Sequence, residues 1–442
     1  MAAERTIRIG LLGFGTVGQG VYKNLVKCGQ ALAWRLGARL EVVRAAARDL
    51  AKPREVTTPT GLLTDDARAI VEDPEIELIC ELMGGTSLAR DLTLRAFETG
   101  KSVITANKAL LCEHGAELFA AARKHGVHYF FEASVAGGVP VIKTLREGLV
   151  ANRFPLIYGI LNGTSNYILT RMEHEGKSFE AIVGDARALG YVEADEGLDL
   201  DGWDAAHKAV VLAFLAHGRW VTYDEMHVEG IRRITQSDFT VAREFGYKIK
   251  LLAVIQRDFA TNTLAVSVRP HLVPPGNPMA RVDMVFNGVS LQGDVVGETF
   301  LLGRGAGQDA TSSAVISDLA DAALALLGAP PPVVSEENVD VYRKLCEGLE
   351  VVAPATLPGA FHLRLRLKDK PGVLADVMRL MADHGISVAR MSQRDEPSGE
   401  TALLAFITHI TTESAMQDCA AALDRADFVI DPPFLIRIFP DQ

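Results

Sequence analysis

The residues best suited to chemistry lie in one acidic stretch, Gly190 to Lys208, which ends in a lysine. From Asp201 onward the apolar spacing predicts a helix, so Asp201, Asp204 and Lys208 fall at positions i, i+3 and i+7 on one helical face. Two carboxylates and an ammonium on one face could hold a charged substrate and move a proton. The alternative is a solvated acidic loop, with Asp201 as the N-cap of the helix and Asp204 as its N3 residue.

A second lysine stands where a ligand crevice is expected. Residues 102–105 predict a short buried strand, and Lys108 follows it after Ala106 and Asn107. In an open sheet of parallel strands, ligands bind outside the carboxyl ends of the strands. Lys108 is therefore predicted to point into the crevice, unlike an ordinary surface lysine.

Three glycines near the start of the chain predict a nucleotide-binding turn. Gly13, Gly15 and Gly18 have the spacing Gly-x-Gly-x-x-Gly, between an apolar run, residues 7–12, and a stretch with helical apolar spacing. The first glycine permits a tight turn, the second a close approach of a pyrophosphate, and the third close packing of helix on strand. Free N–H groups at the helix start would bind the phosphates.

The end of the second predicted strand bears on the choice of dinucleotide. Residues 40–47 run into Arg48 and Asp49. An arginine at this position suits a ribose 2′-phosphate, and a carboxylate suits the 2′-hydroxyl. Arg48 comes first, with Lys52 and Arg54 nearby, so the sequence favours NADP, while Asp49 keeps NAD as an alternative.

Charge and composition exclude several classes of protein. The 442 residues carry a formal net charge of −11, which argues against nucleic-acid binding, since that needs clustered Lys and Arg. The five cysteines are scattered without metal-type or redox spacing, which predicts free thiols in a reducing cytoplasm. The sequence shows no signal peptide and no apolar run of membrane-spanning length, so we expect a cytoplasmic protein without a membrane partner.

The order of predicted elements separates the chain into folded parts. Strands alternate with helical stretches through residue 150, which predicts an α/β, Rossmann-type doubly wound parallel sheet in residues 1–150. Residues 151–303 predict an α+β domain with a mixed sheet. The strand-like runs late in that domain are 264–270, 283–289 and 291–296, of which the last two predict a hairpin.

The remaining sequence predicts a return to the nucleotide domain, a linker and a small C-terminal domain. Helix 304–327 follows a second glycine-rich turn, and we expect it to pack on the nucleotide domain. The stretch 328–359, which has three consecutive prolines near its start, at 330–332, predicts a linker with a short helical piece. Residues 360–442 have the βαββαβ order of a ferredoxin-like fold.

At the level of motifs the chain resembles homoserine dehydrogenases with a C-terminal ACT regulatory domain. The resemblance runs from the glycine fingerprint to about residue 327, with the ACT domain beyond. Six motifs occur in the family's order, and they are Glu81–Gly85, Thr105–Lys108, Glu132–Gly138, Leu161–Asn166, Gly190–Lys208 and Gly303–Gly307.

The resemblance implies reversible, NAD(P)-dependent interconversion of L-homoserine and L-aspartate 4-semialdehyde, a step toward threonine, methionine and isoleucine. Aldehyde reduction needs a hydride from the nicotinamide and a proton for the developing alkoxide. By resemblance Lys208 is the proton donor, while Glu193 and Asp204 hold the substrate. Lys108 would reach cofactor and substrate, and its ammonium is a second candidate donor. Glu193 or Asp199 could bind the substrate ammonium.

Further roles are carried over from the family onto matching positions. Residues 151–303 would form the catalytic and dimerisation domain of a homodimer or homotetramer. A monovalent cation such as sodium would bind Glu132 and the backbone carbonyls of Val135, Gly137 and Val139. Threonine, the end product, would inhibit through the ACT domain, near Lys368–Gly372 and Gly385–Ser387. Cofactor-contacting positions are Thr16, Val17, Arg48, Thr105, Lys108, Gly190 and Gly307.

The chain departs from the family pattern at two positions. Glu196 and Ala310 replace prolines usual in the family, which affects loop stiffness more than chemistry.

Two alternative functions are less consistent with the sequence. One, an aspartate-semialdehyde dehydrogenase, needs a cysteine nucleophile beside a base, and no such motif is present. The other, a non-catalytic nucleotide or amino-acid sensor, leaves Lys108, Asp204 and Lys208 together without a role.

Overall fold

The computed structural model describes residues 5–190, 196–329, 339–396 and 399–440. The chain forms two compact units, each built from three segments. Unit 1 comprises Met1–Ile157, His207–Val221 and Phe286–Leu349, and unit 2 comprises Tyr158–Ala206, Thr222–Val285 and Glu350–Gln442. Among the described residues, no helix combines the length and the apolar character needed to cross a membrane.

Unit 1 contains a six-stranded parallel sheet in the order β3-β2-β1-β4-β5-β6. The chain places β2 and then β3 on one side of β1, and afterwards β4, β5 and β6 on the other side. This is the doubly wound order, and its reversal between β1 and β4 is where such sheets bind ligands. The predicted Rossmann-type sheet is therefore confirmed. The strands are β1 (Arg5–Leu12), β2 (Ala38–Ala46), β3 (Leu63–Thr64), β4 (Leu78–Glu81), β5 (Ser102–Thr105) and β6 (Tyr129–Phe130).

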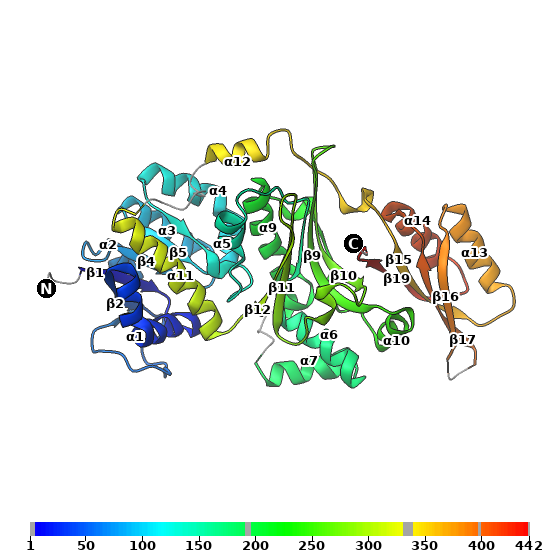
Figure 1. The fold of residues 1–442 in the computed structure, drawn as a ribbon. Helices are drawn as coiled ribbons and strands as arrows, with labels where there is room; N and C mark the ends of the chain where they lie inside the picture. The colour runs from blue at the N-terminus through cyan, green and yellow to red at the C-terminus, as the bar shows by residue number, and fades with distance from the viewer. Residues whose placement is uncertain (1–4, 191–195, 330–338, 397–398, 441–442) are drawn as a thin grey trace. The chain divides into compact units, whose positions relative to one another are not determined.

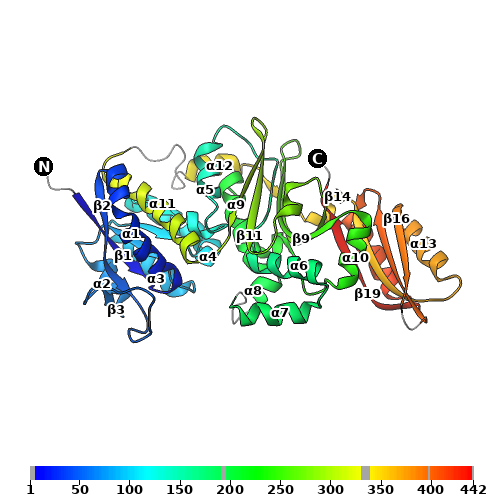
Figure 2. The same ribbon diagram turned by 60° about the horizontal axis from the view of Figure 1, so that its bottom comes forward.

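Helices cover this sheet, and two of them lie side by side although they are distant in sequence. α1 (Thr16–Leu36) packs against α11 (Gln308–Leu326), as Figures 1 and 2 show. Val315 and Leu319 of α11 join the buried core that β1 and α1 form. The other helices of unit 1 include α2 (Ala67–Glu72), α3 (Ser87–Glu98), α4 (Lys108–His125), α5 (Val141–Lys143) and α12 (Val339–Leu345).

Unit 2 combines a middle region with the C-terminal module. The middle region contains α6 (Gly163–Glu175), α7 (Phe179–Ala188), α8 (Glu196–Leu200), β8 (His227–Val228), α10 (Gln236–Phe245), β9 (Lys248–Asp258) and β10 (Thr263–Val273). The C-terminal module contains β15 (Phe361–Lys368), α13 (Val373–Asp383), β16 (Val388–Asp395), β17 (Thr401–Thr408), α14 (Glu413–Asp424) and β19 (Val429–Ile438). This confirms the predicted βαββαβ order. Both module helices pack on one face of its sheet, through a shared core that includes Met381 and Met416 (Figure 1).

The two parts of unit 2 share one sheet, which the sequence did not predict. β10 and β19 pair in parallel, with His271 opposite Arg437 and Leu272 opposite Ile438. The path β9-β10-β19-β15-β17-β16 therefore continues from the middle region into the C-terminal module. The strand β9 was also missed, although it is the long antiparallel partner of β10.

Two predicted boundaries are wrong. The hairpin expected at 283–289 and 291–296 is formed by β11 (Phe286–Gly293) and β12 (Gly297–Arg304). Its turn lies later, just before Gly297, whose φ of +79° a glycine adopts without strain. The helix expected from Asp201 is α9 (Trp203–His217), which begins two residues later and is preceded by the short helix α8.

Candidate active site

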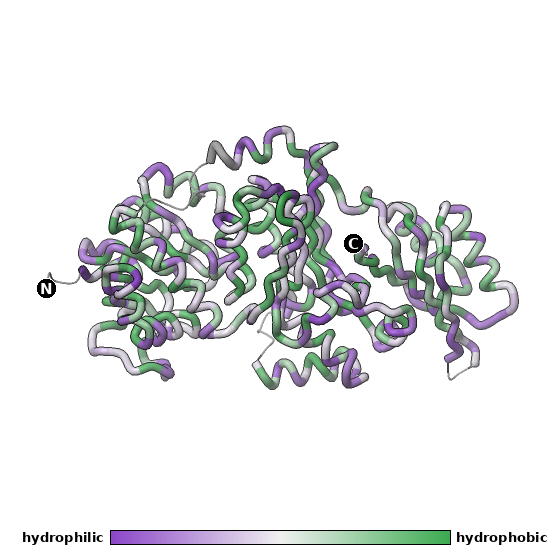
Figure 3. Tube along the Cα trace, in the orientation of Figure 1, coloured by the Kyte–Doolittle hydropathy of each residue, from purple (hydrophilic) through white to green (hydrophobic). Residues whose placement is uncertain are grey.

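The helix α9 carries the two residues that the sequence placed at the centre of the chemistry. Its trace is mostly hydrophobic (Figure 3), and residues 204–215 are buried except for His207. Asp204 and Lys208 are therefore polar exceptions, with only 8% and 9% of their surface exposed. One helical turn separates them, so they lie on the same face. The boundary between the two units falls within this helix, after Ala206, so α9 belongs to both.

An asparagine holds the acidic side of the site together. The side-chain nitrogen of Asn162 donates to Asp199 Oδ1 at 2.7 Å and to Asp204 Oδ2 at 2.8 Å. The Asn162 oxygen accepts from the Ser165 backbone N–H at 2.7 Å, which caps the start of α6. Both amide atoms are thus engaged, and the orientation of the amide is fixed by the helix start. Two carboxylates that meet at one donor attract a positively charged group.

Asn162 is a site residue that was not predicted from the sequence. It lies within the motif Leu161–Asn166, one of the six that resemble the family. The signal that could have identified it is the N-cap position, an asparagine directly before a predicted helix. The two carboxylates that it joins, Asp199 and Asp204, were both predicted to hold the substrate.

The other acidic residues of the stretch have different surroundings. The Asp201 carboxylate forms an ion pair with Arg232 at the surface, two residues before α9 begins, so the N-cap assignment for Asp201 is wrong. Glu196 pairs with Arg187, also at the surface. Gly190 follows α7 with a φ of +73°. Glu193 lies outside the described residues.

The glycine fingerprint has the geometry of a nucleotide-binding turn. Gly13 has a φ of +108°, and a Cβ on it would meet the Leu82 carbonyl oxygen at 2.6 Å. A Cβ on Gly18 would meet the Gly13 carbonyl oxygen at 2.2 Å. Gly15 is the N-cap of α1, and Thr16 and Val17 form the first turn of this long helix. The N-terminus of α1 therefore offers backbone N–H groups to an anion.

The end of β2 holds a cationic loop. Arg48 is exposed there. The Asp49 carboxylate accepts hydrogen bonds from the Ala51 and Lys52 backbone N–H groups, at 2.9 and 3.2 Å. Arg54 donates to the carbonyl oxygens of Asp49, Leu50 and Lys52. One oxygen of the Asp49 carboxylate is thus already engaged in its own turn.

The carboxyl ends of β4 and β5 bring Lys108 to the crevice side of the sheet. Lys108 is the first residue of α4, and Asn107 caps that helix by accepting from the Leu110 N–H at 3.1 Å. The Thr105 hydroxyl donates to the Glu81 carboxylate at 2.7 Å. Gly13 follows β1, Thr105 ends β5 and Lys108 comes after β5, so these three predicted cofactor contacts lie at the carboxyl ends of two strands on either side of β4.

The residues predicted to bind a monovalent cation form a buried turn. The Glu132 carboxylate accepts from the Ile142 and Lys143 backbone N–H groups at 3.1 and 2.8 Å. Burial raises the pKa of Glu132 to about 7, although these hydrogen bonds and the charges of Arg146 and Lys143 oppose the rise. Ala136 and Gly137 both have a φ of +54°. Among the described residues no group of three or more His, Cys, Asp or Glu side chains could hold a metal.

Three of the five cysteines are poorly suited to act as nucleophiles. All five are free thiols. Burial raises the pKa of Cys112 to about 12 and that of Cys419 to about 11, and it also raises the pKa of Cys80. A thiolate is the nucleophilic form, so these buried thiols are poor nucleophiles. This geometry disfavours the cysteine chemistry of an aspartate-semialdehyde dehydrogenase.

Three successive regions of the chain match models of known protein families. Residues 13–132 match the NAD-binding domain of homoserine dehydrogenase, residues 140–320 match homoserine dehydrogenase itself, and residues 361–426 match the ACT domain.

Individual relatives match over the whole length. The homoserine dehydrogenase of Pseudomonas aeruginosa is 38% identical over 437 residues, which covers 98% of this chain and 99% of that protein. A crystal structure of a homoserine dehydrogenase from Thiobacillus denitrificans has a TM-score of 0.91 at 39% identity and covers 98% of both chains. A hyperthermophilic archaeal homoserine dehydrogenase in complex with NADPH has a TM-score of 0.62 at 26% identity, covering 74% of this chain and 99% of that one. The fold, the nucleotide turn and these matches together place the chain in the homoserine dehydrogenase family, as a member with a C-terminal ACT domain.

Proposed function

We propose that the chain catalyses NADPH-dependent reduction of L-aspartate 4-semialdehyde to L-homoserine, and the reverse oxidation. A hydride from the nicotinamide reaches the aldehyde carbon, and a proton reaches the aldehyde oxygen. The observation that carries the proposal is the Asn162 amide joining Asp199 and Asp204 at the start of α9, one turn before Lys208. Asp199 of α8 and Asp204 of α9 are thereby held close together, and Lys208 follows Asp204 one turn later on α9.

Lys208 is the proton donor in this proposal, and the acidic groups bind the substrate ammonium. An ammonium can donate a proton to a developing alkoxide. Lys208 is buried and lies one turn after Asp204 on α9. Asp199 and Asp204 supply acceptors for the substrate ammonium, and Glu193 is a further candidate. Lys108, at the edge of the nucleotide sheet, would bind the substrate carboxylate and the cofactor.

NADP is the preferred cofactor in the proposal. Support comes from the loop after β2, where Asp49 is occupied by two backbone N–H groups and Arg48 is exposed. A ribose 2′-phosphate would therefore find an exposed cation at this position. The archaeal relative in complex with NADPH agrees with this preference. The phosphates would lie at the N-terminus of α1, and Gly190 and Gly307 are further contact positions.

A monovalent cation such as sodium is proposed at Glu132 and the carbonyls of Val135, Gly137 and Val139. The donor set fits a hard cation, because it offers one buried carboxylate and backbone carbonyl oxygens. A buried carboxylate whose pKa is raised to about 7 also gains from a nearby positive charge. The ion would hold the turn that contains Ala136 and Gly137, and we assign it no step in the reaction.

Regulation is proposed for the ACT domain, with threonine as the ligand near Lys368–Gly372 and Gly385–Ser387. In functional terms residues 1–150 bind the nucleotide, 151–303 bind substrate and mediate a homodimer or homotetramer, 328–359 link, and 360–442 regulate. We place the protein in the cytoplasm, where the free thiols described above are stable.

The test is oxidation of NADPH and NADH with aspartate semialdehyde by the wild type and by Lys208→Ala. We expect kcat of the variant to fall roughly 10²- to 10⁴-fold, the range typical of a lost general acid, while the Kd for NADPH stays nearly unchanged. Glu196→Gln is the control, since it removes a surface charge from the same stretch, and its kcat should stay within about twofold. Near-normal turnover by Lys208→Ala contradicts the assigned role.

A further inference from the structure

Glu81 is a fully buried carboxylate at the point where the nucleotide-binding sheet reverses. It is the last residue of β4, which neighbours β1, and none of its surface is exposed. Its backbone partner across the sheet is Leu12, the residue before Gly13 of the fingerprint. A glutamate is almost never fully buried unless its oxygens have partners, because its desolvation is costly.

Both oxygens of Glu81 accept hydrogen bonds from the loops that flank the cofactor crevice. Oε1 accepts from the Met83 backbone N–H at 2.8 Å, in the loop after β4. Oε2 accepts from the Thr105 hydroxyl at 2.7 Å, at the end of β5. The Thr105 oxygen in turn accepts from the Asn107 backbone N–H at 2.9 Å. The hydroxyl therefore has one fixed direction, as a donor to Glu81 and an acceptor from the next loop.

The same network continues to the start of the helix that carries Lys108. The Asn107 side-chain nitrogen donates to the Gly85 carbonyl oxygen at 2.8 Å, and its oxygen caps α4. The loop after β4 and the loop after β5 are thus tied together through one asparagine and one carboxylate. Displacing Glu81 would loosen both loops together.

The electrostatics of Glu81 are those of an acid with neutral partners. Burial raises its pKa to about 7, and the hydrogen bonds of Thr105, Met83 and Asn107 only partly oppose the rise. The titratable group that bears on it is Tyr129 of β6, whose own pKa burial raises well above its usual value, so the phenol stays neutral. A neutral glutamine of similar size would cost less to bury, so the carboxylate requires a reason beyond packing.

We propose that Glu81 is a positioning residue for hydride transfer, whose carboxylate fixes the Met83–Gly85 and Thr105–Lys108 loops around the nicotinamide end of the cofactor. The inference rests on the proposed function and adds a residue to it. An acceptor-only carboxylate can receive the Met83 N–H and the Thr105 hydroxyl at once. An amide turns one of its ends into a donor, so one of these bonds is lost or reversed.

The experiment compares Glu81→Gln with the wild type in three measurements. We expect kcat for homoserine oxidation to fall roughly 10- to 100-fold, as for a small misplacement of reacting groups, while the Kd for NADPH changes less than about threefold. The wild-type profile of kcat against pH should contain an ionisation near pH 7 that the variant lacks. The fluorescence of bound NADPH should shift toward that of the free cofactor.

Two further variants separate positioning from general loss of stability. Thr105→Val removes the donor to the same carboxylate, so its effect should not add to that of Glu81→Gln in the double variant. Lys101 is another buried charged residue of unit 1, directly before β5, and its ammonium donates to the Val71 carbonyl oxygen. Lys101→Met removes this charge. It should lower Tm yet leave kcat and the pH profile unchanged.

The proposal is overturned if Glu81→Gln keeps the wild-type kcat and pH profile, or if its losses match those of Lys101→Met. Unchanged emission of bound NADPH also overturns it, and this measurement needs no turnover. If the wild-type chain binds NADPH but does not oxidise homoserine, the proposed function is refuted. The emission of bound NADPH, compared between the wild type and Glu81→Gln, still tests the role of Glu81 in that case.

Discussion

The two units bury carboxylates in opposite ways. In unit 1, Glu81 and Glu132 are bonded mainly by backbone N–H groups and a hydroxyl, and burial raises the pKa of each to about 7. In unit 2, Glu413 of the C-terminal module is buried beside Arg269 and Arg437. Burial raises the pKa of Glu413 too, but the hydrogen bond and charge of Arg269 outweigh it, so the pKa ends below its usual range.

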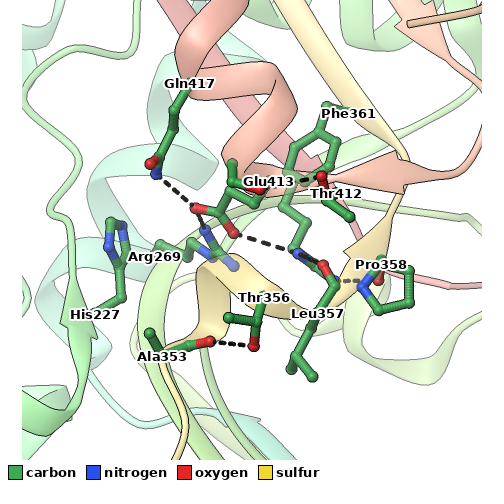
Figure 4. A network of polar contacts seen from close by, with 12 residues as sticks. His227, Arg269, Ala353, Thr356, Leu357, Pro358, Phe361, Thr412, Glu413 and Gln417 are labelled. Carbon is green, nitrogen blue, oxygen red and sulfur yellow. Dashed lines mark hydrogen bonds and ion pairs between the residues drawn. The ribbon is translucent and has the colours of Figure 1, made fainter. Parts of the chain in front are cut away.

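The ion-paired cluster of unit 2 joins the C-terminal module to the middle region. Glu413 begins α14, Arg269 lies on β10 and Arg437 on β19. Figure 4 shows the Arg269 and Gln417 side chains turned toward the Glu413 carboxylate, with Gln417 donating at 3.3 Å. Asp238 of α10 makes a similar buried pair with Arg364 of β15. Paired charges here serve cohesion, whereas Glu81 of unit 1 lies among residues expected to serve catalysis.

The two arrangements give stability opposite dependences on pH. Glu81 and Glu132 hold protons in the folded state that the unfolded chain releases above about pH 4.5, so unit 1 loses stability as pH rises toward 7. Glu413 releases its proton more easily when folded, so its contribution is present at neutral pH and is lost as pH falls through its lowered pKa.

The largest expected effect comes from breaking the ion-paired cluster. Glu413→Ala leaves Arg269 and Arg437 buried without their carboxylate, so the free energy of unfolding of unit 2 should fall by about 3–5 kcal/mol. Urea denaturation at neutral pH, followed by a probe in the C-terminal module, measures the loss. A loss below about 1 kcal/mol would show that the cluster behaves like an exposed pair.

A somewhat smaller effect is expected from an acid with neutral partners. Glu132→Gln should remove the contribution of Glu132 to the decline in unfolding free energy of unit 1 between about pH 4.5 and 7, roughly 3 kcal/mol for a pKa raised to about 7, and leave that of Glu81. Denaturation at several pH values in a sodium-free buffer measures the slope. Sodium chloride added to the wild type should reduce the decline more than choline chloride does. An unchanged slope in the variant would show that Glu132 does not hold a proton in the folded state over this pH range.

The smallest effect is expected from an ion pair at the surface, which serves as the control for the buried carboxylates. Arg366 and Glu396 form such a pair in the C-terminal module, with exposed fractions of 41% and 26% for the two side chains. Arg366→Ala should cost about 0.2–1 kcal/mol, and less at high salt. The same denaturation experiment applies, and a loss as large as that of Glu413→Ala would remove the distinction between buried and exposed pairs.

The sequence predicted the elements whose signals are local. The fingerprint at Gly13–Gly18 identified the first turn of the parallel sheet, and alternating and helical spacing gave the βαββαβ order of the C-terminal module. The β11–β12 hairpin was misplaced because several residues can form its turn and only tertiary pairing selects Gly297. The parallel contact of β10 with β19 joins residues far apart in the chain, which no local pattern encodes.

The sequence predicted several residues of the candidate site, but it did not predict the hydrogen bonds that connect them. Asp199, Asp204 and Lys208 stood out by charge and spacing, and their proposed roles remain predictions. Asn162 did not stand out, because a neutral amide has no charge pattern and its two carboxylate partners lie 37 and 42 positions away. Glu81 lay inside a quoted motif, yet its bond to Thr105 exists only once β4 and β5 are adjacent.

The shared sheet of unit 2 has a consequence for how regulation can be studied. One side of β10 pairs with β9, and the other side is covered in three short pieces, by β13 (Glu350–Val351), β8 and β19. A chain shortened near residue 355 would uncover the backbone of β10 at His271 and Leu272, and an open strand edge is a template for aggregation. Substitutions inside an intact C-terminal module keep that edge closed, so they separate allosteric control from solubility where a truncation would confuse the two.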